Sequence, residues 1–269
     1  MKHIVLLVLL ATLSCQTKTP VMNDPIPDHD SLKIESKFVN ETRVINIWTP
    51  PTYKNSTDSF PVLYMPDGGI KEDFPHVANT IAKLVKNKSI PPIILVGIEN
   101  TERRRDLTGF SSVKDDEQYC PLTDGAKDFR QFIKQELFQK IESNYRVTTK
   151  RGIIGESLAG LFVVETIMQH PETFDYYIAF DPSLWWNNHA LVKQSEDIFN
   201  QFPSSNKKLW FAGSDAEDIY KHTRVLAKTL ENQTQINWKY ADEPKEHHHT
   251  IFRASKEKAL IWMFNESLN

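Results

Sequence analysis

The chain has 269 residues, a formal net charge of −3, and a composition that is 40% hydrophobic and 11% aromatic. This is enough apolar material for one large core, and α/β folds of this length commonly form a single domain. The small negative charge offers no general attraction to nucleic acid or to anionic lipid, and no long basic run is present. Neither is therefore expected as a direct partner.

The first 15 residues, MKHIVLLVLLATLSC, combine a lysine, an apolar run of signal-peptide length and a small residue before Cys15. They resemble a bacterial lipoprotein signal, in which the cysteine is lipidated, although Thr12 stands where leucine is usual and simple secretion is the alternative. Residues 16–30 are polar and contain proline, which predicts a flexible tether before a single domain over 31–269. The expected location is the bacterial cell envelope, with a lipid anchor in the periplasm or outer membrane.

The spacing of apolar residues predicts alternating strands and helices after this tether. In the first half we expect an antiparallel strand pair over 33–39 and 43–48, a strand over 60–65, a helix over 75–86 and a strand over 93–98. In the second half we expect helices over 124–144, 161–169, 220–230 and 256–264, and strands over 151–154, 176–180, 209–212 and 236–240. This alternation predicts an α/β fold with a mainly parallel sheet, helices on both faces and an antiparallel N-terminal edge.

The segment IIGESLAGLF, residues 153–162, carries the first chemical signal. Gly155-Glu156-Ser157-Leu158-Ala159 fits the nucleophile elbow G-x-S-x-G, with alanine in place of the second glycine. Such a serine lies in a strained turn between strand and helix, so its neighbours two positions away must be small. The five-residue pattern alone is weak evidence for a nucleophile, and the alternative interpretation is that Ser157 caps the following helix. The strand-turn-helix context favours a nucleophile.

A serine nucleophile needs a base, which in such sheets follows the last strand. The segment EHHHTI, residues 246–251, places His247, His248 and His249 there. Three adjacent histidines also suggest a metal site, but neighbours in an extended loop point in different directions and rarely bind one ion together. No metal ligand is predicted, and the pattern does not choose among the three.

The remaining parts of the site are a carboxylate that orients the base and amides that stabilise an oxyanion. Asp215, just past the predicted strand over 209–212, is the first choice for the acid, with Glu217 and Asp181 as alternatives. The backbone N–H of Leu158 is one expected oxyanion donor. Gly69, in the Gly-Gly turn after the strand over 60–65, is the expected second.

With these residues placed, the chain resembles the putative esterase family of α/β hydrolases, which includes esterase D, ferric enterochelin esterases, and some feruloyl and acetylxylan esterases. The resemblance runs from about residue 32 to 264. Its segments occur in order as PVLYMPDGG, PPIILVGIEN followed by RRRDLT, DFRQFIKQELFQKIESNYRV, GESLAGLF, DPSLWW and EHHHTI. It implies an α/β-hydrolase fold and a serine carboxylesterase that forms an acyl-enzyme without a cofactor.

The resemblance also implies individual roles. In the family the base is followed by a small residue, a serine or threonine and an aliphatic residue, a register that selects His248. Trp185 and Trp186 follow the strand expected beside the elbow and are expected to line the substrate pocket, with packing as the alternative. Arg105, in the run of arginines over 103–105, is a candidate contact for an anionic substrate, although a solvated charge run is the simpler interpretation.

The expected substrate is a soluble small-molecule or glycan-linked ester. The two options are a siderophore ester of the enterochelin type and an acetyl or feruloyl ester of a carbohydrate. The alternative function is that of a catalytically inactive α/β-hydrolase relative that acts as a binding protein of the cell envelope.

Overall fold

The computed structural model describes residues 24–203 and 206–265, which form an eight-stranded sheet in the order β1-β2-β4-β3-β5-β6-β7-β8. The strands β1 (Asp30–Ser36) and β2 (Glu41–Trp48) pair antiparallel, and β2 also pairs antiparallel with β4 (Ile94–Ile98). All further pairings are parallel, and they join β4 through β3 (Phe60–Met65), β5 (Val147–Glu156), β6 (Tyr176–Phe180) and β7 (Lys208–Gly213) to β8 (Asn237–Asp242). The predicted fold class is confirmed.

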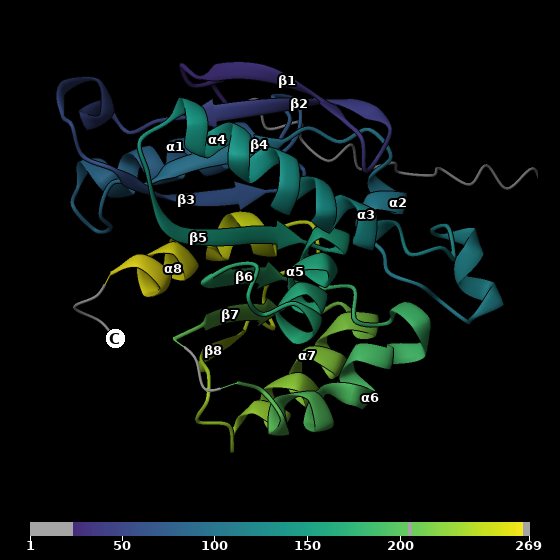
Figure 1. Ribbon diagram of the computed structural model, residues 1–269. Coiled ribbons are helices and arrows are strands. Elements are labelled where there is room, and N and C mark those ends of the chain that lie inside the picture. The colour runs from purple at the N-terminus through teal and green to yellow at the C-terminus, as the bar shows by residue number, and fades with distance from the viewer. Residues whose placement is uncertain (1–23, 204–205, 266–269) are drawn as a thin grey trace, which may run out of the picture.

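Helices cover both faces of this sheet (Figure 1). One face packs against α1 (Phe74–Lys86) and α8 (Ile251–Phe264), and the other against α3 (Gly125–Phe132), α4 (Phe138–Asn144), α5 (Leu158–Gln169), α6 (Trp186–Asn200) and α7 (Glu217–Leu230). In β5, Ile153 belongs to the second layer and Ile154 to the first, and both are fully buried. Burial on both faces explains why the central strands are apolar throughout.

The helices differ from the sequence prediction mainly at their starts. The long predicted helix over 124–144 is α3 and α4 joined through a π-helical segment, η3 (Ile133–Leu137), and Asp124 caps it by accepting a hydrogen bond from the Lys127 N–H at 3.0 Å. The helix α6 was not predicted, since only a few of its residues are buried and residues 187–189 have left-handed backbone angles. Three short helices also lie in predicted loops: η1 (Pro51–Asn55), α2 (Arg103–Asp106) and η2 (Lys114–Gln118).

The segment before β1 lies against the folded body. Asp24 forms a 2.6 Å ion pair with Arg253 of α8, and the Pro25 carbonyl accepts a hydrogen bond from Asn79 of α1 at 2.7 Å. Asp24 and Pro25 belong to the predicted tether over 16–30, which stays a prediction. The predicted signal sequence with Cys15 lies outside the described residues and stays a prediction. Within the described ranges, no helix combines the length and the apolar character needed to cross a bilayer.

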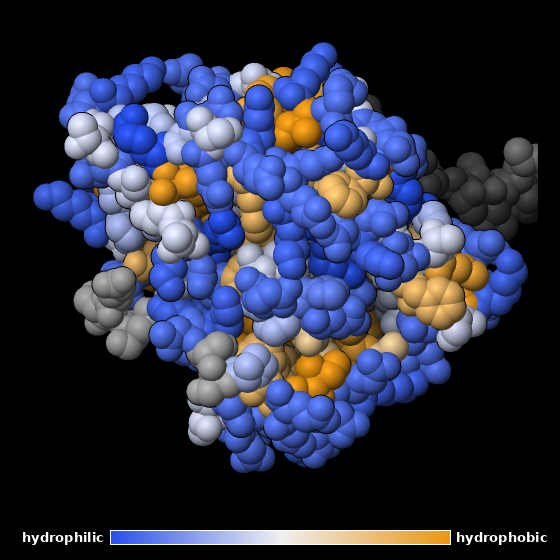
Figure 2. All heavy atoms as spheres, in the orientation of Figure 1, coloured by the Kyte–Doolittle hydropathy of each residue, from blue (hydrophilic) through white to orange (hydrophobic). Residues whose placement is uncertain are grey.

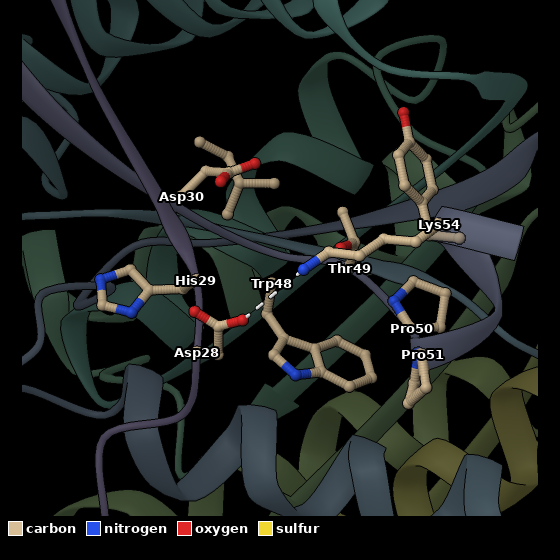
Figure 3. Close-up of a pocket in the computed structure, with 10 residues that line it drawn as sticks. Asp28, His29, Asp30, Trp48, Thr49, Pro50, Pro51 and Lys54 are labelled. Carbon is tan, nitrogen blue, oxygen red and sulfur yellow. Dashed lines mark ion pairs between the residues drawn. The ribbon is translucent and has the colours of Figure 1, made fainter.

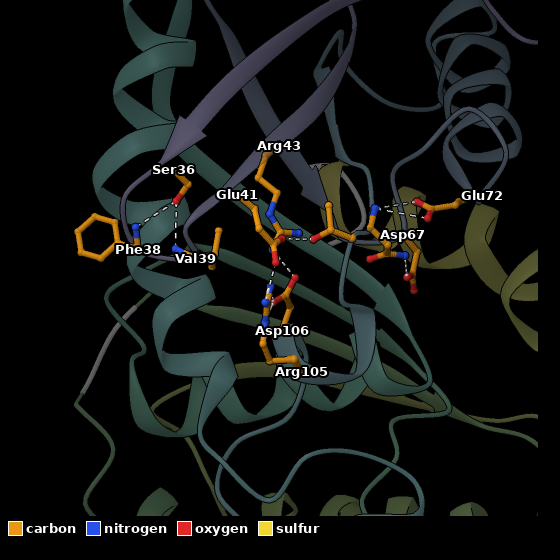
Figure 4. A network of polar contacts seen from close by, with 11 residues as sticks. Ser36, Phe38, Val39, Glu41, Arg43, Asp67, Glu72, Arg105 and Asp106 are labelled. Atoms are coloured by element: carbon orange, nitrogen blue, oxygen red, sulfur yellow. Dashed lines mark hydrogen bonds and ion pairs between the residues drawn. The ribbon is translucent and has the colours of Figure 1, made fainter.

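A buried charge network holds the antiparallel edge to α2 (Figure 4). The Arg43 side chain is only 1% exposed and donates to the Asp106 carboxylate at 2.6 Å, and Glu41 lies 3.1 Å from the same guanidinium. Arg105 donates to both Glu41 and Asp106. Two arginines and two carboxylates thus neutralise each other at the point where the chain leaves β4 for α2.

We expect Arg43→Met to lower the free energy of unfolding by about 3 kcal/mol, because removing one partner of a buried ion pair leaves the other charge poorly compensated. Arg105 still contacts Asp106 in this variant, which limits the loss. Urea denaturation measures the change. The control is Lys83→Ala, whose ion pair with Glu257 is exposed on both sides and is expected to contribute less than about 1 kcal/mol. Equal effects of the two variants would contradict the buried network.

Candidate active site

The turn between β5 and α5 gives Ser157 an unusual backbone conformation. Its φ of 60° and ψ of −119° lie in a region that residues other than glycine rarely adopt. The turn is fixed by hydrogen bonds to the neighbouring strand, since the Ser157 N–H donates to the Phe180 carbonyl at 3.0 Å and its carbonyl accepts from the Ser183 N–H at 3.1 Å. This strained conformation is the one expected of a nucleophile elbow.

The small residues around Ser157 are required by contact between strand and helix. A Cβ atom placed on Gly155 would lie 2.7 Å from both the backbone and the Cβ of Ala159. Ala159 is fully buried, so nothing larger fits there without moving α5 away from β5. Ala159 can replace the second glycine of the pattern because Gly155, which faces it, has no side chain.

Three side chains form a hydrogen-bonded line at this turn. The Ser157 Oγ lies 3.1 Å from Nε2 of His248, and Nδ1 of His248 lies 3.0 Å from Oδ2 of Asp181. With Nδ1 protonated and donating to Asp181, Nε2 is free to accept the serine proton. This is the arrangement of nucleophile, base and orienting acid that activates a serine.

Asp181 follows β6 directly and is fully buried. Its carboxylate accepts hydrogen bonds from the backbone N–H of Ser214 at 2.6 Å and from the Ser214 hydroxyl at 2.5 Å. These two donors come from the end of β7 and hold the carboxylate toward the histidine. The hydrogen bond to Asp181 raises the pKa of His248 above its usual value of 6.5.

Asp215, the first choice for the orienting acid, does not contact His248. Its carboxylate lies 2.7 Å from Nδ1 of His247, on the exposed side of the loop. Glu217, the second choice, has an 84% exposed side chain that pairs with Lys221. The geometry corrects both choices. Strand β6 lies directly beside β5, whereas β7 is one strand further away. Asp181 at the end of β6 is therefore nearer to Ser157 than Asp215 after β7.

The other two histidines of the triplet face elsewhere. His247 and His249 stack with their ring centroids 5.7 Å apart, and the side chain of His247 is 60% exposed. The register expected for His248 therefore coincides with the one histidine of the three that contacts Ser157.

Of the two backbone N–H groups expected to bind an oxyanion, those of Leu158 and Gly69, only that of Gly69 donates a hydrogen bond to another group in the described part of the chain. Leu158 lines the cleft beside Ser157 and is the first residue of α5, so its N–H has no acceptor within the helix. The N–H of Gly69, in contrast, donates to Oε2 of Glu72 at 2.7 Å. Gly69 is therefore not a free donor in this structure, which corrects the expectation. The glycine before it serves packing, since a Cβ on Gly68 would lie 2.2 Å from the backbone of Ile98.

An open cleft of about 350 Å³ lies above the serine. Two walls of different character border it. Tyr119 and Trp185 form an edge-to-face aromatic pair with centroids 5.2 Å apart. Arg103 and Arg104 also line the cleft, and the Arg103 guanidinium lies 3.5 Å from the Glu156 carbonyl of the elbow. The further lining residues are Cys120, Leu158, Ser183, Ala216, Asp218, Ile219 and His248. The face shown in Figure 2 is mostly hydrophilic with small separate apolar spots. The side chain of Tyr119 is 51% exposed, which is high for a large hydrophobic residue.

Two expected substrate contacts are not part of this cleft. Trp186 is 5% exposed and its indole N–H donates to the Gly109 carbonyl at 3.0 Å, which is a packing role. Arg105 is held by Glu41 and Asp106, at 2.6 and 2.7 Å. Of the arginine run, Arg103 and Arg104 reach the cleft instead. Arg103 is fixed there because its guanidinium donates two hydrogen bonds to Asp67, at 2.6 and 2.8 Å.

A larger cavity of about 480 Å³ lies between η1, the end of β2 and the segment before β1 (Figure 3). Asp28 and His29 line it, and Lys54 reaches to 3.8 Å from the Asp28 carboxylate across an exposed opening. Trp48 pairs with Leu95 at the start of β4, so this cavity lies at the edge of the sheet opposite Ser157. Its lining contains no serine or cysteine.

Two residues near the serine were missed by sequence reasoning. Tyr119 lies in the segment over 107–124, where no element was predicted, and only its contact with Trp185 places it at the cleft. Ser183 follows Asp181 by two positions, and its Oγ lies 3.5 Å from that of Ser157. No sequence pattern assigned here marks either residue.

Comparison with known proteins agrees with this geometry. Residues 36–264 match the model of the family described as "Putative esterase". The chain belongs to this family. Similar proteins include the ferri-bacillibactin esterase BesA of Bacillus subtilis, 28% identical over 68% of this chain and 69% of that protein. The apo-salmochelin esterase of Escherichia coli is 25% identical over 86% of this chain and 78% of that protein.

Among solved structures, an IroE-like serine hydrolase from Shewanella oneidensis superposes on this member of the esterase family with a TM-score of 0.81. The two are 27% identical, and the match covers 88% of this chain and 80% of that structure. The family resemblance drawn from the sequence motifs is thereby confirmed over nearly the whole of the sheet.

We expect Asp181→Asn to lower the turnover of p-nitrophenyl acetate about 10³-fold, because an amide no longer holds His248 in the tautomer whose Nε2 accepts a proton. The matched control is Asp215→Asn, which removes a carboxylate from the neighbouring His247 and is expected to leave turnover within about twofold. A large loss with Asp215→Asn and a small one with Asp181→Asn would reverse the assignment of the acid.

Proposed function

We propose that this protein is a serine carboxylesterase that hydrolyses a soluble siderophore ester through an acyl-enzyme. The observation that carries the proposal is the hydrogen-bonded line from Asp181 through His248 to Ser157, which ends at the floor of an open cleft. Membership of the esterase family supports the reaction class, and the siderophore esterases among the relatives support the substrate class.

The first half of the reaction forms the acyl-enzyme. His248 accepts the Ser157 proton at Nε2 while Oγ attacks the ester carbonyl, and Asp181 stabilises the imidazolium that forms. The carbonyl oxygen becomes negatively charged and lies at the N-terminus of α5, where the Leu158 N–H and the helix dipole favour an anion.

The second half releases the acid. The protonated Nε2 of His248 donates its proton to the departing alkoxide, so that the alcohol leaves neutral. Water then enters, His248 removes its proton, and the resulting hydroxide attacks the acyl carbon. Collapse of this second intermediate returns the proton to Ser157 and frees the carboxylic acid.

The lining of the cleft favours a bulky substrate that carries rings and negative charge. The Tyr119–Trp185 pair offers apolar ring surface, against which an aromatic group packs with offset or edge-to-face geometry. Arg104 is exposed at the rim, where its charge attracts anions, and Asp218 on the lining limits how close an anion approaches on its own side. A carbohydrate ester would use the same Trp185 ring as a sugar platform and is the second candidate.

Labelling with a fluorophosphonate probe tests the nucleophile. We expect one covalent adduct on the wild-type protein and none on Ser157→Ala, because only an activated serine attacks the phosphorus. Ser183→Ala is the control. Its hydroxyl lies 3.5 Å from the Ser157 hydroxyl, while the ring nitrogens of His248 bond to Asp181 and Ser157 among the described residues, so this variant should still be labelled. A folded wild type that does not react would instead support the inactive binding protein.

Steady-state kinetics on a panel of esters tests the substrate class. We expect Tyr119→Ala and Trp185→Ala each to raise KM for ferri-bacillibactin about three- to tenfold, the value of one aromatic contact, with little effect on p-nitrophenyl acetate. Phe110→Ala is the control, because Phe110 is 62% exposed and does not line the cleft. Efficient turnover of feruloyl or acetyl sugars with none of siderophore esters would establish the second candidate.

A further inference from the structure

Glu156, the last residue of β5, has no role in the reaction as described. Its side chain is 19% exposed, and its Oε1 lies 3.8 Å from Nε2 of His248. Because it precedes Ser157 in the strained elbow, its backbone is fixed by the same turn that fixes the nucleophile. The fold therefore fixes the position from which this side chain extends, and its carboxylate lies next to the histidine.

The imidazole of His248 thus lies between two carboxylates. Asp181 contacts Nδ1 at 3.0 Å, and Glu156 approaches Nε2, the nitrogen that exchanges a proton with Ser157. A separation of 3.8 Å is too long for a hydrogen bond but short for two opposite charges in a half-buried site. Glu156 therefore interacts mainly with the protonated, positively charged form of the ring.

We propose that Glu156 is a positioning residue whose carboxylate stabilises the imidazolium of His248 by attracting the proton on Nε2. This inference rests on the serine-esterase function proposed above. When Ser157 attacks, its proton moves to Nε2 and the new positive charge lies beside Glu156. When the alkoxide leaves, the same proton moves on to it. Glu156 itself neither gains nor loses a proton in the cycle.

The charges around Glu156 and His248 shift the pKa values of both groups, and so determine the pH at which both are charged. The pKa of Glu156 is raised to about 7, mainly by burial; His248 and Arg103 lower it, and the nearby carboxylates Asp73 and Asp67 raise it. For His248, the hydrogen bond to Asp181 raises the pKa most, burial opposes it, and Glu156 and Asp218 also raise it. Each of the two groups is thus among the causes that shift the pKa of the other, so Glu156 and His248 interact electrostatically in both directions.

The sign of the effect on activity follows from the role of the base. His248 must be neutral to accept the serine proton, so any group that raises its pKa moves the acid limb of the pH–rate profile to higher pH. In the wild type, the ionisation of Glu156 changes the charge beside His248, which broadens this limb. In Glu156→Gln the limb becomes a single ionisation, about half to one pH unit lower.

The rate at high pH should change in the opposite direction. Above both ionisations the wild-type Glu156 is charged and supports the imidazolium in the transition state. Glu156→Gln loses that support, so we expect its plateau rate to fall about three- to tenfold. A variant that is relatively more active on the acid limb and less active at its plateau is not what a packing defect produces.

Two measurements test the inference. The first is the rate of fluorophosphonate labelling as a function of pH for the wild type, Glu156→Gln and Glu156→Asp. The second is an NMR titration of the His248 ring, assigned among the nine histidines by its loss in His248→Asn. The control is Asp215→Asn, which removes a carboxylate from the neighbouring His247 and should leave the His248 midpoint unchanged. Glu156→Asp keeps the charge and should lie between the wild type and Glu156→Gln.

The outcomes separate this inference from the proposed function. A lower His248 midpoint in Glu156→Gln, partly restored by aspartate, supports the role of Glu156. An unchanged midpoint and unchanged labelling profile overturn it while the esterase proposal stands. If the wild type is not labelled at any pH, the esterase proposal fails, and the NMR titration still decides whether Glu156 controls the protonation of His248.

Discussion

The close contact between β5 and α5 is the constraint on which the rest of the site depends. Gly155 and Ala159 leave no room for larger side chains, and the turn between them places Ser157 at positive φ with its N–H bonded to the end of β6. That bond fixes the distance between two strand ends. Ser157 and Asp181 follow adjacent parallel strands, so the hydrogen-bonded line through His248 is short, and the sheet fixes the positions of both its ends.

Buried carboxylates at the carboxyl edge of the sheet each find partners from another element. Asp67 after β3 is held by Arg103 of α2, and Asp181 after β6 by Ser214 after β7. Leaving such a charge without donors in a dry site is costly, so each one links the two segments that it joins. The walls of the cleft are thereby tied to the strands, and pre-organised groups of this kind stabilise charge without having to reorient.

Much of this arrangement follows from local sequence. The central strands are apolar because both of their faces are covered, and Gly155 and Ser157 lie in a strand-turn-helix context that a single sequence shows. The acid could not be chosen in this way, because Asp181 and Asp215 each follow a strand and only the spatial order of β5, β6 and β7 decides between them. The position of Tyr119 could not be predicted either, because its partner Trp185 is distant in the sequence. The helix α6 was missed because few of its residues are buried, which leaves little hydrophobic periodicity.

Because the carboxylate that contacts His248 follows β6, the segment after β7 does not have to supply it. Ser214 serves the acid through its backbone N–H and its hydroxyl, but the residues that follow it contact neither Ser157 nor the imidazole of His248 through a catalytic hydrogen bond. Ala216, Asp218 and Ile219 nevertheless line the cleft. Substitutions of Ala216 or Ile219 would change which molecules fit the cleft while the hydrogen-bonded line from Asp181 to Ser157 stays in place. Asp218 differs from these two residues, because its charge also raises the pKa of His248.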